Sequence, residues 1–500
     1  MDIWSNLAIG FGEVLTLSTL GYCLAGVTVG MLIGVLPGIG AMAAISMLMP
    51  LTFYLEPGQA LIMLAGIYYG AQYGNSITSI LLNVPGTPSS AVTALDGYPL
   101  CKQGKAGPAI FITTAASFFG SCFAILCLAF FSPIIAEFAL NFGSVEYFSL
   151  MVFGLITASV VAPGSQLKGI AMVIVGLVLG LVGTDITTAT FRFTFGFIEL
   201  TDGITLVAVA MGVFGATEVI TNLSRPKNER GTAQNLRIRE LLPSWQDMRQ
   251  AVKPMMRGAP IGTFLGVLPG AGATISAFVA YGVENRVAKD RSRFGKGAIE
   301  GIAAPESANN AAAQGSFIPT LSLGIPGDAV MALMLGALLI HGVQPGPQLI
   351  SENPEIFWGL LASFWIGNLM LLVMNIPMIG VWVRILSIPY RILYPCILML
   401  VCVGVYSVNN SAFDLMLVFV FTLVGFAMSL ARLSPAPMLL GIVLGVMMED
   451  NLKRAMLLSR GDPMIFLDRP ISALLLGLSA AVLVLPVLLS LWRGAKRRGG

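Results

Sequence analysis

Apolar stretches long enough to cross a lipid bilayer recur along the whole chain, and they constrain the fold more than any other feature. The hydrocarbon core of a bilayer is about 30 Å thick, so a helix needs about 20 apolar residues to span it. By this rule we expect about ten to twelve crossings. The clearest uninterrupted candidates are Ala106–Phe131, Tyr147–Ala162, Gly169–Gly183, Ile204–Ile220, Ile356–Ile376, Ala412–Leu430 and Ile471–Leu491.

The composition also indicates that the chain lies in a lipid bilayer. Of the 500 residues, 56% are hydrophobic and only 11% are charged, whereas soluble domains carry about 25% charged residues. Too few polar residues are present to cover a soluble core of this size. We therefore predict an all-α polytopic membrane protein in contact with the lipid bilayer. The net charge of +3 is small and gives no indication of nucleic-acid binding.

The chain contains an internal duplication. The segment Gly34–Gly40 recurs as Gly266–Gly272, with the Leu-Pro-Gly core unchanged. Further along, Val84-Pro85-Gly86 recurs as Ile325-Pro326-Gly327, so the order and the approximate spacing are both kept. We expect a first membrane repeat over residues 1–221 and a second over 258–500, the latter with a C-terminal helix and a basic tail. The long polar segment 222–257 is predicted to be a cytoplasmic linker between them.

The distribution of basic residues predicts that the two repeats have opposite orientations. Basic residues flank the second Pro-Gly segment at Arg257 and Arg286, which favours a hairpin that enters from the cytoplasm and returns. Residues 1–101 contain no Lys or Arg, so the equivalent hairpin of the first half should open to the outside. Such an inverted repeat is typical of secondary transporters. The basic tail, with Arg493 and Lys496, predicts a cytoplasmic C-terminus.

Four Pro-Gly pairs predict re-entrant or broken helices. Proline removes a backbone donor, glycine permits left-handed angles, and non-helical backbone at membrane depth persists only around protein or a water-filled cavity. Broken helices expose N–H groups that suit a carboxylate and carbonyls that suit a cation. The alternative is that the pairs are kinks that allow close packing. Their matched positions in both halves favour a binding site.

Small polar residues surround the breaks and supply neutral oxygen ligands and donors. Taken singly, each is better explained as contact between helices, but the clusters predict a lined site. A sodium ion near the breaks is the candidate metal, with no ligand set assigned. The candidate substrate- and ion-binding residues are Pro37, Gly38, Gly40, Asn75, Ser76, Thr78, Ser79, Asn83, Pro85, Gly86, Thr87, Ser89, Pro269, Gly270, Gly272, Glu306, Ser307, Asn309, Asn310, Ser316, Pro326, Gly327 and Asp328.

Ionisable residues inside a membrane are costly and are functional candidates by default. Asp328 follows Pro326-Gly327, where it either binds a cation or caps the next helix. Glu306 follows Pro305, and the alternative to a functional role is an acid in the first turn of a helix. The single histidine, His341, precedes a turn-rich segment and is interpreted as structural.

Enzyme motifs are missing from the sequence. We find no Walker GxxxxGK[ST] segment, and one histidine cannot form HExxH. The six cysteines form no CxxC pair and are interpreted as packing residues. We therefore expect no enzyme activity and no cofactor, and we expect energy from an ion gradient or from the gradient of the transported molecule.

These motifs resemble those of the tripartite tricarboxylate transporter family, in its large membrane subunit of the TctA type. The resemblance extends over almost the whole chain. The segments that carry it are Gly34–Gly40, Gly66–Gly74, Asn83–Pro88, Gly266–Gly272, Ala304–Ala311 and Gly324–Gly327.

The resemblance implies partners that the sequence itself does not reveal. It implies a small four-helix membrane subunit and a periplasmic substrate-binding protein that delivers a di- or tricarboxylate such as citrate. It also implies uptake coupled to a cation, Na⁺ or H⁺, across a bacterial inner membrane. Three alternatives stay open, namely a standalone ion-coupled carboxylate transporter, a passive carboxylate channel, and a membrane scaffold or sensor.

Overall fold

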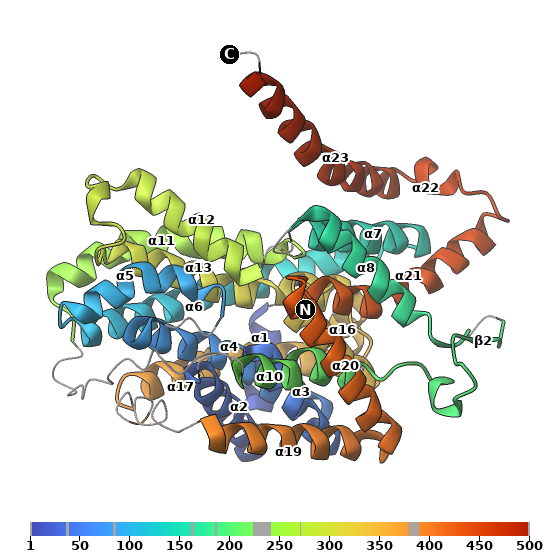
Figure 1. Ribbon diagram of the computed structural model, residues 1–500, viewed down its shortest axis with the longest axis horizontal. Coiled ribbons are helices and arrows are strands. Elements are labelled where there is room, and N and C mark those ends of the chain that lie inside the picture. Colours follow the sequence, from blue (N-terminus) through green and yellow to red (C-terminus); the bar gives the residue numbers. More distant parts are fainter. Residues whose placement is uncertain are drawn as a thin grey trace. The chain divides into compact units, whose positions relative to one another are not determined.

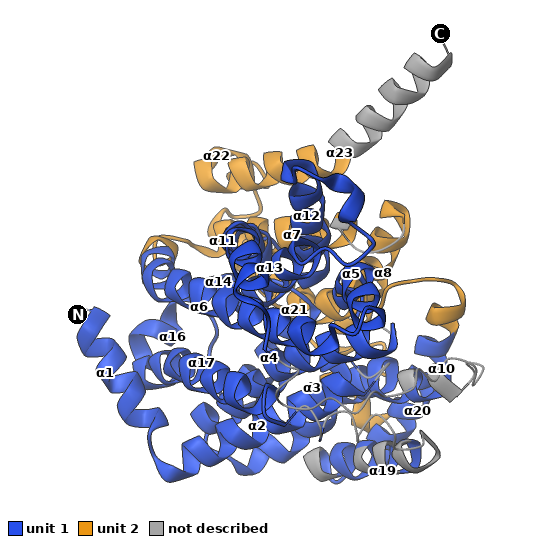
Figure 2. Cartoon of the chain, turned by 90° about the vertical axis from the view of Figure 1, so that its left-hand side faces the viewer, with its two compact units in different colours: residues 1–136, 207–426 blue, residues 137–206, 427–500 orange. Residues whose placement is uncertain are grey.

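A computed structural model describes the backbone of residues 3–36, 40–83, 87–161, 165–185, 188–223, 242–270, 272–378, 381 and 390–498. The chain forms two compact units, each built from separate segments. The first contains Met1–Ala136 and Val207–Phe426, and the second contains Glu137–Leu206 and Ala427–Gly500 (Figure 2). The two repeats predicted from the recurring sequence segments have other bounds than these units, and they remain a prediction. Most of the predicted linker lies outside the described residues, but α11 begins within it, at Trp245.

The described part of the first unit consists of helices (Figure 1). Its earlier helices are α1 (Ile3–Val14), α2 (Leu17–Val35), α3 (Ala41–Leu48), η1 (Met49–Tyr54), α4 (Pro57–Leu82), α5 (Ser90–Lys102) and α6 (Ala106–Ala139), whose end enters the second unit. Its later helices are α9 (Leu206–Ala210), η3 (Met211–Ala216), α10 (Thr217–Leu223), α11 (Trp245–Val267), α12 (Gly272–Val287), η5 (Arg291–Arg293), α13 (Glu300–Gly315), α14 (Phe317–Leu323), α15 (Ala329–Ile340), α16 (Pro347–Glu352), α17 (Pro354–Asn375), α19 (Tyr390–Asn409) and α20 (Ala412–Leu430).

The second unit is a smaller helical cluster with one short hairpin. Its elements are α7 (Ser144–Val161), α8 (Gln166–Gly180), β1 (Gly183–Thr184), β2 (Phe191–Arg192), η2 (Ile198–Leu200), α21 (Ala436–Leu458), α22 (Ile465–Asp468) and α23 (Pro470–Arg498). Helix α21 packs against α7 and α8, and β1 pairs with β2 in antiparallel fashion. Arg192 of the hairpin donates to Glu449 of α21 at 2.6 Å, which fastens the hairpin to this helix.

Helix lengths and composition confirm an all-α polytopic membrane protein. Among the described residues, four helices are long and apolar enough to cross a bilayer: Leu17–Val35, Ala106–Ala139, Pro354–Asn375 and Ala412–Leu430. Shorter apolar helices include Ser144–Val160, Gln166–Gly180 and Ala329–Ile340. The number of crossings remains a prediction.

The two halves of the sequence show the same helix packing within the first unit. Glycines at every fourth residue of α2 lie against α4, where a Cβ on Gly30 would meet the backbone of Ile67. Glycines at the same spacing in α11 lie against α13, where a Cβ on Gly262 would meet the backbone of Ala308. Lipid offers no hydrophobic force that draws helices together, so membrane helices associate through small residues that allow close approach. Each half thus contains one tightly packed helix pair.

The break at Pro269-Gly270 produces the hairpin expected from the flanking charges. Arg257 of α11 donates to Glu284 of α12 through two hydrogen bonds, of 2.5 and 2.7 Å. This contact places the middle of α11 beside the later part of α12. The chain therefore runs along α11, leaves the helix after Val267 and returns along α12.

Candidate functional site

The two Pro-Gly breaks of the second half lie in direct contact. Pro269 and Gly270 form the turn between α11 and α12, and the Gly270 N–H donates to the Gly327 carbonyl at 2.8 Å. Gly270 and Gly272 both have positive φ, of 82° and 52°, which explains why glycine stands there. The first-half candidates Pro37, Gly38, Pro85 and Gly86 lie outside the described residues.

Gly327 lies where two chain segments leave no room for a side chain. A Cβ at this position would come within 2.8 Å of Ser316 Cβ and within 3.0 Å of the Gly266 carbonyl oxygen. Pro326 precedes it in the non-helical segment between α14 and α15, and both residues are buried. This segment therefore combines a helix break with a close approach of backbone to backbone.

Asp328 caps α15 and also contacts the first half of the chain. Its carboxylate accepts from the Met331 N–H at 2.9 Å, so the capping alternative is confirmed. The other carboxylate oxygen accepts a hydrogen bond of 2.6 Å from the hydroxyl of Tyr68 on α4. A cap alone does not require this second bond, which joins the two halves of the sequence beside the Pro-Gly break.

Glu306 lies in the interior of a helix rather than at its start. We expected that it was either functional or an acid in the first turn after Pro305, and the second alternative is wrong. Helix α13 begins at Glu300 and continues through Pro305, because prolines are tolerated in membrane helices where neighbours satisfy the freed backbone groups. The Glu306 side chain is fully buried.

Three hydroxyl groups from three other helices donate to the Glu306 carboxylate. Thr93 of α5 donates to Oε1 at 2.5 Å, and Ser76 of α4 donates to Oε2 at 2.7 Å. Ser117 of α6 also donates to Oε2, at 3.3 Å, and accepts from Asn310 Nδ2 at 2.7 Å. The second half thus provides the carboxylate and the first half provides the hydroxyls.

Several buried amides near these residues lack hydrogen-bond partners. On α13 and α4, Asn309 and Asn75 have both side-chain polar atoms buried and unpaired, and Asn310 has an unpaired Oδ1. Gln314 on α13 is unpaired at both atoms, and Gln72 on α4 is unpaired at Oε1. Buried polar groups without a partner cost free energy, so this concentration of them on two facing helices marks a place that can bind polar groups.

The other described candidates also make contacts that hold the local structure. Thr78, Ser79 and Ser316 donate to carbonyls of their own helices, Ser307 donates to the Met255 carbonyl on α11 at 2.9 Å, and Thr87 and Ser89 share a hydrogen bond. Asn83 ends α4 in the left-handed conformation with φ 54°. Gly40 precedes α3 as its N-cap. Of the predicted site residues, the structure brings Ser76, Glu306 and Asn310 into one hydrogen-bonded cluster.

A comparison with protein families identifies what kind of chain this is. The sequence model of the tripartite tricarboxylate transporter TctA family matches residues 20–440. The chain belongs to this family. It is thus a member of a transporter family rather than of an enzyme family, and the resemblance stated above is confirmed.

Two relatives of this TctA-family chain come from Agrobacterium vitis. The "uncharacterized 52.8 kDa protein in TAR-I ttuC' 3'region" is 49% identical over 491 residues, which cover 98% of this chain and 97% of the relative. The "uncharacterized protein in TAR-II ttuC' 3'region" is 50% identical over 230 residues, which cover 46% of this chain and 95% of the relative. No solved structure matches the chain.

Sequence reasoning missed two residues that contact the candidate acids in this TctA-family protein. Ser117 was not among the candidates, although it donates to Glu306, whereas Thr93 belongs to the cluster of small polar residues expected around the first-half breaks. Tyr68, which donates to Asp328, was also absent from the candidates. A signal for Tyr68 existed, because it lies within the family segment Gly66–Gly74. Ser117 had none, since a lone serine in an apolar helix usually bonds its own backbone.

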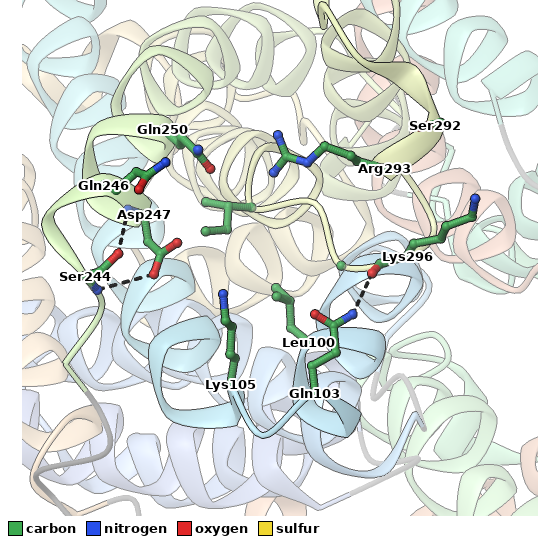
Figure 3. A pocket seen from close by; sticks show the side chains of 12 residues that line it. Leu100, Gln103, Lys105, Ser244, Gln246, Asp247, Gln250, Ser292, Arg293 and Lys296 are labelled. Atoms are coloured by element: carbon green, nitrogen blue, oxygen red, sulfur yellow. Dashed lines mark hydrogen bonds between the residues drawn. The ribbon is translucent and has the colours of Figure 1, made fainter.

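A cavity of about 700 Å³ lies elsewhere in the first unit. Figure 3 shows its lining residues, among them Lys105, Arg293 and Lys296, with Asp247 at the start of α11. None of the predicted site residues lines it. It lies beside the ends of α5 and α11, and it is not the candidate site.

Proposed function

We propose that this chain is the large transmembrane subunit of a cation-coupled secondary transporter that imports tricarboxylates such as citrate or related carboxylates. The observation that carries the proposal is a fully buried carboxylate, Glu306, held by the helices of both halves in a member of the TctA family. A buried acid between helices is costly and is typical of ion pathways in transporters.

The starts of α3 and α15, which follow a Pro-Gly break in each half, differ in the charge that they favour. Helix α3 begins after Gly40, which has no side chain to cap it, so its first N–H groups suit a carboxylate of the transported molecule. At α15, Asp328 occupies that position. An acidic cap repels an anion and favours a cation. We therefore propose that the substrate lies at the first-half break and not at the break before α15.

Membership of the family supports a proposal for the partners and the location. We propose that a small four-helix membrane subunit assembles with this chain and that a periplasmic substrate-binding protein delivers the carboxylate. The system would lie in a bacterial inner membrane, with Na⁺ or H⁺ as the coupling ion and with the C-terminus in the cytoplasm. Its basic tail, which ends in Arg497 and Arg498, supports this orientation.

The proposed mechanism is alternating access by an elevator-like or rocking movement of two inverted repeats. The shared packing of α2 on α4 and of α11 on α13 supports the repeat. Cysteine labelling from each side of the membrane would test it. If the hairpins at Pro37 and Pro269 both open to the same side, the inverted arrangement is refuted.

Uptake of labelled carboxylates tests the function itself. Cells that express this chain with both partners would be measured with and without a sodium gradient, and again without the binding protein. We expect concentrative, sodium-dependent uptake that is lost without the binding protein. Uptake that persists without it would support a standalone transporter, and uptake that only equilibrates would support a passive channel.

A further inference from the structure

The hydrogen bonds of the Glu306 carboxylate do not neutralise its negative charge. The three hydroxyls that surround it are neutral, and none of the ion pairs among the described residues includes Glu306. An ionised carboxylate in the low-dielectric interior of a membrane protein needs one compensating positive charge. Either a proton on the carboxyl or a bound cation supplies that charge.

The other charged and titratable groups on the neighbouring helices have partners of their own. On α5, Asp96 accepts from the backbone N–H groups of residues 297 and 298 at 2.8 Å. Arg257 and Glu284, on α11 and α12, form an ion pair. On α4, the Tyr73 hydroxyl donates to Asn368 on α17 at 3.1 Å. The groups that face α13 therefore leave the charge of Glu306 uncompensated.

The oxygen atoms around Glu306 are those that a hard monovalent cation requires. They comprise two carboxylate oxygens and the hydroxyl oxygens of Ser76, Thr93 and Ser117. Independently of these, the amide oxygen of Asn310 is buried and has no partner, although the Nδ2 of the same amide donates to Ser117. A proton on Glu306 would cancel the charge but would leave this amide oxygen unpaired. A metal cation would satisfy both.

We propose that Glu306, Ser76, Thr93, Ser117 and Asn310 form a binding site for a single sodium ion, separate from the site of the transported carboxylate. The assignment rests on the proposed function, in which a cation drives uptake. The bound ion would neutralise Glu306 and so remove its repulsion of an anionic substrate. It would also hold α4, α5 and α6 against α13, because the ligands come from all four helices.

Sodium binding to the purified full-length chain tests this site without any substrate or partner. The midpoint of thermal unfolding would be followed in lipid nanodiscs while NaCl replaces choline chloride at constant ionic strength, at two pH values. We expect a saturable rise with Na⁺ that K⁺ does not reproduce, as for any ligand that binds only the folded state. Glu306→Gln should abolish this rise, and Ser117→Ala should raise the sodium dissociation constant by about tenfold.

The matched control is Glu300→Gln, the same substitution at the start of the same helix. Glu300 is paired with Arg293 and lies away from the hydroxyls, so its variant should keep the wild-type response to sodium. A wild-type sodium response in Glu306→Gln would overturn the proposal. If Glu306→Gln does not fold, an unchanged sodium dissociation constant in Ser117→Ala would overturn it instead. Stabilisation of the wild type that follows pH and not Na⁺ would replace sodium by a proton and overturn the assignment.

Failure of this site and failure of the transport function give different results. If sodium binding is lost in Glu306→Gln but the wild-type chain with its partners takes up no carboxylate, the proposed function is wrong and the site stands. If Glu306→Gln takes up carboxylate with the sodium dependence of the wild type, the site is wrong and the function stands.

Discussion

The substitution Gly262→Ala should loosen the tightest helix pair of the second half. The position that a Cβ would take on Gly262 is 2.6 Å from Ala308 Cα and 2.7 Å from Ala308 C, and it also meets the Ala308 carbonyl oxygen. Carbon atoms in contact are normally about 3.5 to 4.0 Å apart. Helices α11 and α13 would therefore have to separate by roughly 1 Å, and such overpacking costs about 1–3 kcal/mol.

Alanine is also a better helix former than glycine, by about 1 kcal/mol, so Gly262→Ala alone gives a mixed result. Gly282→Ala is the matched control, because it lies inside α12 and nothing lies within 4 Å of the position of its Cβ. The difference between the two variants isolates the packing cost. We expect the free energy of unfolding of Gly262→Ala to be lower than that of Gly282→Ala by about 1–3 kcal/mol.

Denaturant unfolding of the purified chain in lipid or detergent measures this difference, and uptake by the same variants measures its effect on the site. Ala308 lies two residues after Glu306 on α13. A shift of α13 should therefore lengthen the bonds from Thr93 and Ser76 and reduce uptake. Equal unfolding free energies for the two variants would show that the backbone contact between α11 and α13 does not exist as described.

Three further substitutions test other contacts. Tyr68→Phe removes the bond of 2.6 Å to the buried Asp328 carboxylate and should lower the unfolding free energy by about 1.5–3 kcal/mol. Gly270→Leu forces a branched side chain into a backbone with φ 82° and should abolish uptake while the protein still inserts, as measured by transport and membrane fractionation. Arg257→Gln leaves Glu284 buried without its cation and should cost about 1–3 kcal/mol in the same unfolding assay.

Each of these variants has a control in the chain. The Tyr69 hydroxyl makes two long contacts, a bond of 3.5 Å to the Ser363 carbonyl and a contact of 4.0 Å with Cys23 Sγ, so Tyr69→Phe should cost less than Tyr68→Phe. Gly282→Leu adds the same side chain where space is open and should keep uptake. Arg249→Gln changes an exposed arginine on α11 and should be nearly neutral. A control that matches its test variant in any of these pairs would contradict the contact assigned to that residue.

The sequence was sufficient to predict where the helices break. Proline and glycine act locally, so Pro269-Gly270 and Pro326-Gly327 could be recognised without knowledge of the fold. The structure confirms both positions, since α11 ends at Val267 and α15 begins at Ala329. The close packing of helices is also visible in the sequence, because glycine stands at every fourth residue of α2 and α11 where these helices contact their partners.

The partners of the buried acids could not be predicted in this way. The contact of Ser117 with Glu306 joins α6 to α13 and depends on how helices far apart in sequence pack. A serine or threonine that bonds another helix looks the same in the sequence as Thr78, which bonds its own backbone. The alternative that Glu306 lies in the first turn of a helix was wrong for a similar reason. Proline in a soluble protein usually marks the start of a helix, but a membrane helix tolerates it inside, and α13 continues through Pro305.

The backbone contact between α11 and α13 has a mechanical consequence. Helices α11 and α13 meet through glycine and alanine, which have no long side chains that could change rotamer. One helix therefore cannot easily slide along the other, and we expect the pair to move as a rigid body. We therefore expect changes of shape in this unit at residues 268–270 and 324–328, which the hydrogen bond between Gly270 and Gly327 connects. Spin labels on α11 and α13 should keep one separation in every state of the protein. A constant separation would mean that each helix pair moves as one body, whereas a changing one would show that single helices bend.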